Sequence, residues 1–137
     1  LFRFPKDRTF EDEHPPFEEI YAKELEKLTV RYSDNAIIQS LYAESLMNTM
    51  PWNYYIDRHK NIPKEDTKKV YQALQRALAI DANNLLALHL YIHIYEASDT
   101  ECIAKHVEVV ADRLYSLMPE APGIGHLIHM PSHIYIR

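Results

Sequence analysis

Histidines are the residues of this sequence whose type and spacing point to chemistry, and most of them fall in two short segments. Five of the eight histidines lie within residues 88–97 and 125–137. Successive residues of an α-helix are rotated by about 100°, so residues three, four or seven positions apart share one face. On the first segment this rule groups His89, His93 and Glu96. On the second segment it groups His126, His129 and His133.

Two imidazole-rich faces on apolar helices predict a site for a divalent metal ion. A neutral imidazole has two polar nitrogens, and burying them without partners is costly. Two histidines four positions apart, which each segment contains, can bind one ion together, as in helical HxxxH zinc sites. His126 or Glu96 would then be a further ligand, a second-shell partner or, for Glu96, the general base on a metal-bound water. A histidine cluster suits zinc, copper or nickel, and we expect zinc or copper.

Two other interpretations of these histidines stay open. The rings, Glu96, Ser132 and the tyrosines can satisfy one another in a buried polar network without a metal, or the histidines can be unrelated surface residues. Pro131 bears on the metal site and on the network alike, because it removes the hydrogen bond to the Leu127 carbonyl and predicts a kink. Such a kink either spreads the rings around a site or breaks the site apart. The remaining histidines are predicted to be surface residues: His14, His59 and His106.

The composition predicts one ordinary soluble domain, or part of one. The 137 residues are 47% hydrophobic and 26% charged, which is usual for a globular protein of this size. A net charge of −5 without a basic patch predicts no nucleic-acid partner. No apolar run reaches the roughly 18 to 20 residues of a membrane span, and the single cysteine, Cys102, cannot form an internal disulfide. Glycine-rich phosphate loops and a GxSxG motif are absent from the sequence.

Apolar residues recur at three- and four-residue steps along most of the chain, and they predict an all-α fold. Polar breaks at residues 33–35 and 81–84 separate helical segments. The predicted helices are residues 16–31, 35–49, 64–79, 84–97, 100–117 and a last one from about 124. Short connections pair them as three antiparallel hairpins, at about 17–50, 64–97 and 100–137, after an N-terminal arm at 1–16.

Several apolar and aromatic side chains are predicted to pack in the core. In the first two helices the expected packing faces include Ile20, Tyr21, Leu28 and Ile37. Residues 51–63 are predicted to be a loop whose aromatic side chains cover the edge of the core: Trp52, Tyr54 and Tyr55. The alternative for this loop is an aromatic-lined ligand cleft.

Several motifs resemble those of tetratricopeptide-repeat (TPR) proteins. The stretch ALAIDANNLLALHLY looks like a TPR hairpin, and LYAESLMNTMPW, HLYIHIYEAS and GHLIHMPSHIYIR are similar to blocks of a bacterial group of such proteins. The similarity covers residues 17–137, which we expect to form a TPR-like helical domain. It implies an α-solenoid in which each repeat buries its apolar face against the next, and it implies no particular reaction. Members of the group are usually longer, so we expect this chain to be a fragment of a longer solenoid.

Our leading hypothesis is a helical-repeat scaffold that binds a protein or peptide partner, with a histidine-rich metal site in its later half. The alternative is a metal-dependent enzyme or a metal-handling protein built on the two histidine faces. Of the two hypotheses, we favour the scaffold over an enzyme. A last helix with an uncovered apolar face also predicts a homodimer or poor solubility.

Overall fold

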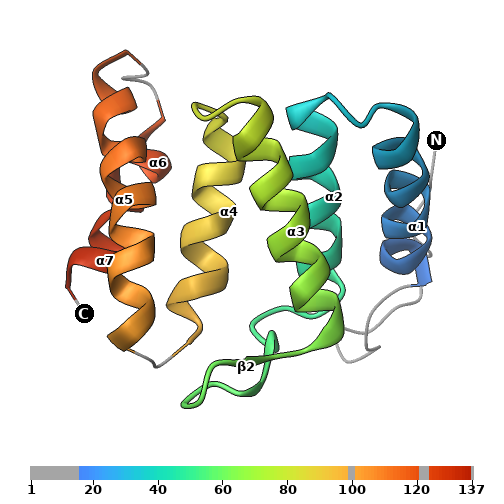
Figure 1. Ribbon diagram of the computed structural model, residues 1–137, viewed down its shortest axis with the longest axis horizontal. Coiled ribbons are helices and arrows are strands. Elements are labelled where there is room, and N and C mark those ends of the chain that lie inside the picture. Colours follow the sequence, from blue (N-terminus) through green and yellow to red (C-terminus); the bar gives the residue numbers. More distant parts are fainter. Residues whose placement is uncertain (1–15, 99–100, 121–123, 137) are drawn as a thin grey trace, which may run out of the picture.

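The computed structural model of the chain describes residues 16–98, 101–120 and 124–136. The first five helices lie side by side in chain order (Figure 1). The described helices are α1 (Pro16–Arg31), α2 (Ala36–Asn48), α3 (Glu65–Ile80), α4 (Leu85–Glu96), α5 (Glu101–Leu117), α6 (Gly125–His129) and α7 (Ser132–Tyr135). A short 3-10 turn, Met118–Glu120, follows α5. The predicted all-α class is therefore confirmed, while the predicted arm at 1–16 lies outside the described residues except for Pro16, which begins α1.

Asparagine side chains cap two of these helices, at the polar breaks that the sequence indicated. The Ile38 amide donates to Oδ1 of Asn35 at 3.1 Å, and the Ala87 amide donates to Oδ1 of Asn84 at 2.9 Å. Each cap satisfies an amide of the first turn that has no partner within its helix. These local bonds explain why α2 and α4 begin where they do.

The segment between α2 and α3 differs from the predicted loop. It contains a two-stranded antiparallel ribbon, in which β1 (Tyr55–Asp57) pairs with β2 (Ile62–Pro63). Tyr54 and Tyr55 are buried, as predicted. The prediction for Trp52 was wrong, because its side chain is 69% exposed and its backbone has a φ of 60°. That left-handed conformation is unusual for a residue with a Cβ atom.

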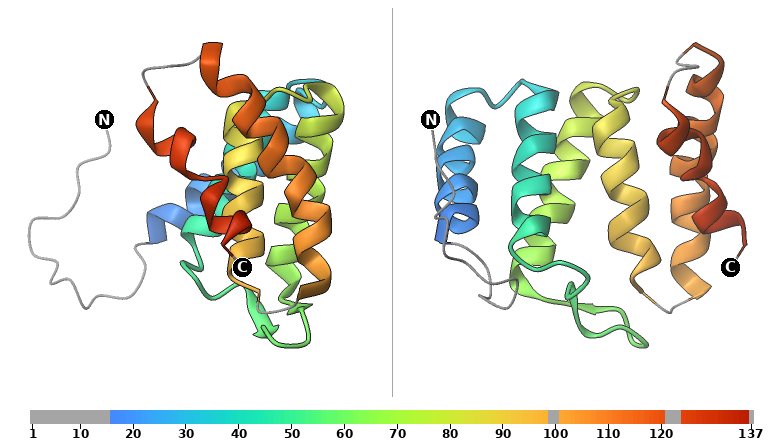
Figure 2. Two further views of the ribbon diagram at one scale, coloured as in Figure 1. Left: turned by 90° about the vertical axis from the view of Figure 1, so that its left-hand side faces the viewer. Right: turned by 180° about the vertical axis from the view of Figure 1, so that it is seen from behind.

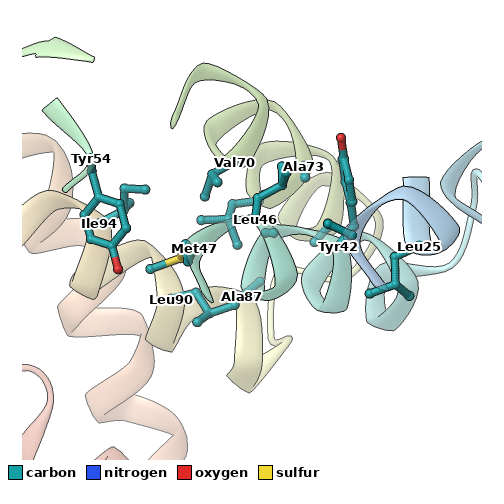
Figure 3. Packing of buried hydrophobic residues seen from close by; sticks show 14 of the residues in the cluster. Leu25, Tyr42, Leu46, Met47, Tyr54, Val70, Ala73, Ala87, Leu90 and Ile94 are labelled. Carbon is teal, nitrogen blue, oxygen red and sulfur yellow. The ribbon is translucent and has the colours of Figure 1, made fainter. Parts of the chain in front are cut away.

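A first hydrophobic core lies between α1, α2, α3 and α4, and Figure 3 shows its packing from close by. Leu46, Val70 and Leu74 are among its buried residues. Four residues expected in packing faces are instead exposed: Ile20, Tyr21, Leu28 and Ile37. Three of them lie on α1, which packs against α2 at the end of the row, so that among the described residues only one side of α1 is covered.

A second hydrophobic core joins α4 to α5, α6 and α7. After α5 the chain turns and runs back along α5 and α4 as α6 and α7 (Figure 2). The buried residues of this core are Leu88, Ile92, Val107, Ala111, Leu114, Met118, Leu127, Met130 and Ile134. Helix α4 therefore contributes to both cores, which explains why its apolar residues are spread around its circumference.

Among the described helices, none has the length and apolar character needed to cross a membrane. The finer arrangement that we expected, a TPR-like α-solenoid of three hairpins, stays a prediction.

Candidate metal centre

The histidine face of α4 lies between the two buried faces of that helix. Leu88 and Ile92 belong to the second core, while Leu90 and Ile94 belong to the first. At about 100° per residue, positions 89, 93 and 96 fall between these two faces. His89, His93 and Glu96 are accordingly half-buried. The same packing that fixes α4 in the molecule thus fixes the direction of this face.

The histidine face of α6 and α7 is fixed in the same way. Leu127, Met130 and Ile134 are buried in the second core, at steps of three and four residues. The adjacent face carries the three predicted histidines of this segment. His126 and His133 contact rings of α4, and His129 contacts His126. These two faces, 30 or more residues apart in sequence, meet because both flank the same core.

Pro131 interrupts the last helix, as predicted, yet it does not separate the histidines. The helix ends at His129 and resumes at Ser132. Met130 and Pro131 nevertheless keep right-handed helical angles, with φ and ψ of −54° and −40° and of −57° and −30°. The backbone between His129 and His133 therefore keeps helical angles, with the His133 amide donating to the Met130 carbonyl as in a 3-10 turn. The ring centroids of the two histidines lie 4.7 Å apart.

Three imidazoles converge closely enough to share one ion. His89, His93 and His126 each offer a nitrogen within 4.8 Å of the others. The Nε2 atoms of His89 and His126 are 3.0 Å apart. Two nitrogens bound to one tetrahedral zinc ion at about 2.05 Å are about 3.3 Å apart. The observed separation is therefore close to that of two ligands of a single ion.

Glu96 connects the two histidine faces through both of its carboxylate oxygens. Oε1 lies 2.5 Å from Nδ1 of His93, and Oε2 lies 2.5 Å from Nδ1 of His133. A carboxylate that accepts the Nδ1 proton fixes the tautomer of each imidazole and leaves the Nε2 lone pair free to bind a metal. This arrangement favours the role of a second-shell partner for Glu96 over that of a ligand or a general base.

The charge states of His89 and Glu96 favour the binding of a cation by the cluster. Burial, with His93 and His126 next to it, lowers the pKa of His89 from 6.5 to about 4, so this ring is neutral at pH 7. Burial alone would raise the pKa of Glu96, but the hydrogen bond from His93 and the charge of His133 lower it below its ordinary value. The cluster thus combines a neutral ligand with an ionised carboxylate behind it.

All six residues of the predicted metal site are brought together. The alternative polar network is present in part. Glu96 bonds His93 and His133, and two further hydrogen bonds join His89 to His126 and His129 to His133. Ser132 stays outside the network, because it donates to the His129 carbonyl at 2.6 Å. Tyr135 donates to Asp112 and so points away from the rings. Of the other histidines, His59 is exposed as predicted. His14 and the side chain of His106 lie outside the described residues.

Sequence reasoning missed one neighbour of the cluster. The indole of Trp52 lies edge to face against His93, with ring centroids 6.1 Å apart. Beside them is an open pocket of about 250 Å³, lined by Glu44, Met47, Asn48, Pro51, Trp52, Tyr54, Leu90 and His93. A larger pocket of about 680 Å³ lies between α1, α2 and the start of α3, away from the histidines. Only the aromatic spacing in residues 51–63 hinted at the smaller pocket.

Comparison with family models, curated proteins and solved structures finds no match to the chain.

Proposed function

We propose that this protein binds a divalent transition-metal ion through His89, His93 and His126. The convergence of these three imidazoles from two helices, with nitrogens within 4.8 Å of one another, is the observation that supports this most strongly. Nitrogen ligands of this kind suit zinc or copper, and nickel as well. Ions that prefer oxygen ligands, such as Ca²⁺ and Mg²⁺, are poor candidates for the position.

The surroundings of the three rings support the same proposal. His89 needs no deprotonation before it binds a cation at pH 7, because its pKa is about 4. Glu96 holds the His93 ring through Nδ1, which resembles the carboxylate–histidine–metal arrangement of known sites. Three protein nitrogens leave a fourth position of a tetrahedral ion for water or another small ligand. A hydrolytic reaction would need a base other than Glu96, whose two oxygens both hold imidazoles.

The predicted protein or peptide partner stays a prediction, and so does the homodimer through the last helix. Metal binding is the function that the described contacts favour, because it explains why polar rings gather between two hydrophobic cores. A scaffold that used only its apolar faces would have no need of these rings.

The direct experiment is metal analysis of untagged protein, because a polyhistidine tag would itself bind the ions under test. We expect about one or more equivalents of zinc or copper to be retained or taken up, with a rise in thermal stability. His93→Ala and His126→Ala should each weaken binding by at least tenfold. His59→Ala is the matched control, because this histidine is exposed on the ribbon turn and should leave binding unchanged. Protein that binds neither ion, and gains no stability from either, would contradict the proposal.

A further inference from the structure

His129 and His133 form a second pair of converging imidazoles, beside the three-histidine position. Their Nε2 atoms are 3.4 Å apart. This distance is long for a hydrogen bond, and it matches the roughly 3.3 Å expected for two nitrogens on one tetrahedral ion. The pair therefore has the spacing of two ligands of one ion, and a long hydrogen bond joins the two rings without one.

The backbone holds this pair in place. Residues 130 and 131 keep helical angles between the two histidines, and Pro131 has a fixed φ that makes this turn stiff. Met130 and Ile134 are buried on the opposite side of the same turn. The two rings are exposed or half-exposed, so an ion and its water ligands can reach them. Preorganised ligands of this kind lose little conformational freedom on binding.

Glu96 links this pair to the first position. One of its oxygens holds Nδ1 of His93, which belongs to the three-histidine position, and the other holds Nδ1 of His133, which belongs to the pair. In both rings the bond to Nδ1 leaves Nε2 as the metal-binding atom. On the side of the pair, that atom is the one that lies 3.4 Å from Nε2 of His129. A carboxylate that served one ion only would need just one of these two bonds.

We propose that His129 and His133 hold a second divalent metal ion, and that Glu96 orients one ligand of each ion. The role of Glu96 toward both ions rests on the function proposed above, whereas the two-histidine chelate does not. The second ion is of the same class as the first, a nitrogen-binding ion such as Zn²⁺, Cu²⁺ or Ni²⁺. Water completes its coordination, because two protein nitrogens fill only half of a tetrahedral shell. We therefore expect it to bind more weakly than the first ion.

Zinc titration of the untagged full chain, followed by calorimetry and equilibrium dialysis, tests the stoichiometry. The wild-type protein should bind two equivalents with separable affinities. His129→Ala combined with His133→Ala should abolish the weaker equivalent and change the affinity of the tighter one by less than about threefold. His59→Ala should keep both equivalents. Circular dichroism checks that each variant is folded, which is expected because His129 and His133 make no part of the buried core.

Each outcome separates the second ion from the first. One equivalent in the wild-type protein, unchanged in the double variant, overturns the second position and leaves the proposed function intact. Loss of all binding in the folded double variant means that the five histidines hold a single ion, which also overturns the second position. No binding to the wild-type protein overturns both proposals. Two equivalents retained by the double variant would show that the second ion is bound elsewhere.

Glu96→Gln provides a measurement that does not depend on removing a ligand. An amide accepts through its oxygen and donates through its nitrogen, so it can keep the bond to one of the two Nδ1–H groups but not to both. We therefore expect at least one equivalent to weaken in this variant. Glu96→Ala removes both bonds, and loss of an orienting carboxylate typically weakens metal binding by about 10- to 100-fold. We expect both equivalents to weaken in the alanine variant. If only one of them weakens there, Glu96 serves a single ion, and the shared role that we propose for it is wrong.

Copper loading gives an independent readout of the second position. Two Cu²⁺ ions at neighbouring positions should broaden each other's electron paramagnetic resonance spectrum, and an unbroadened spectrum at two equivalents would contradict neighbouring positions.

Discussion

His89 and His126 are 37 positions apart in sequence, yet their Nε2 atoms lie 3.0 Å from each other. In the absence of a metal, one of these rings must donate and the other accept, so the two tautomers are coupled. Binding of a cation through both Nε2 atoms would require the donating ring to carry its proton on Nδ1 instead. Metal binding by these neutral rings therefore changes a tautomer and releases no net proton.

Trp52 should report metal binding through its fluorescence. It is the single tryptophan of the sequence, and the centroid of its indole lies 6.1 Å from the centroid of the His93 ring. Cu²⁺ quenches indole fluorescence efficiently at short range, whereas Zn²⁺ has a filled d shell and should change the emission much less. We expect strong quenching as Cu²⁺ is added to the wild-type protein. His93→Ala should shift the quenching curve to at least tenfold higher copper concentration, while His59→Ala leaves it in place. Equal curves for all three proteins would mean that copper quenches from another site.

The metal-free protein should lose stability as the pH falls, over a range set by the pKa of His89. The pKa of this residue is about 4 in the folded protein, against an ordinary value of 6.5. A depressed histidine pKa means that the unfolded chain binds the proton more tightly, so acid favours unfolding. The contribution is fully present above about pH 6.5 and is lost as the pH falls toward 4.

Urea unfolding in the presence of a chelator, at several pH values from 7 to 5, measures this dependence. His89→Gln removes the titrating ring and keeps a side chain of similar size. We expect the free energy of unfolding to fall less steeply with acid in this variant than in the wild-type protein. Parallel curves for the two proteins would show that His89 is not the group responsible. Glu96 has a lowered pKa and adds a loss in the same direction, but only below its ordinary value of 4.5.

Burial of Leu114 should contribute substantially to stability, because this residue joins α5 to the second core and is 0% exposed. Leu114→Ala leaves a cavity, and such substitutions usually cost about 2–5 kcal/mol. Val109→Ala on the same helix is the matched control, because Val109 is 69% exposed. Its effect should stay within about 0.5 kcal/mol. Chemical denaturation of both variants checks the difference, and similar losses would contradict the described orientation of α5.

Much of the helical framework could be predicted from the sequence, because its determinants are local. Asn35 and Asn84 cap helices that begin one residue later, and the apolar repeat marks the faces that pack. The two histidine faces followed from the same periodicity. Ile37 shows where this reasoning fails: it lies in a helix with nearly the predicted bounds but is 61% exposed, because no element in the described part of the chain covers that side of α2.

The bridge formed by Glu96 could not be predicted from the sequence. The spacing of His93 and Glu96 places them on one face of α4, but contact with His133 depends on how α7 is rotated against α4. That rotation is set by Met130 and Ile134, which pack against residues of α4 and α5 far away in sequence. Trp52 likewise was missed, because its backbone adopts a left-handed conformation that no residue type around it demands.

Gln39 carries a buried polar atom that lacks a partner among the described residues. Its Nε2 makes a long hydrogen bond of 3.4 Å to the Thr29 carbonyl, and its Oε1 makes none. An unsatisfied buried oxygen costs about 1–3 kcal/mol. Gln39→Met keeps the length of the side chain and removes this oxygen, so we expect stability to stay equal or to rise by up to about 1 kcal/mol. Gln39→Glu, which adds a charge at the same buried place, should destabilise the protein strongly. A clear loss of stability in the methionine variant would show that the amide contributes more than its single long bond suggests.

Pro131 should be replaceable by alanine without loss of the histidine geometry. Met130 and Pro131 already have helical backbone angles, and alanine prefers the same conformation. The new amide can donate to the Leu127 carbonyl, a bond that proline forbids. Against this, the unfolded chain gains freedom when proline is lost, at a cost of about 0.4–1 kcal/mol. We therefore expect Pro131→Ala to change metal affinity by less than about threefold and stability by about 1 kcal/mol or less.

Pro131→Gly is the informative comparison, because glycine loosens the turn between His129 and His133 and should weaken the second zinc equivalent selectively. If alanine disrupts metal binding as much as glycine does, the ring of the proline, rather than the helical turn, positions these two histidines.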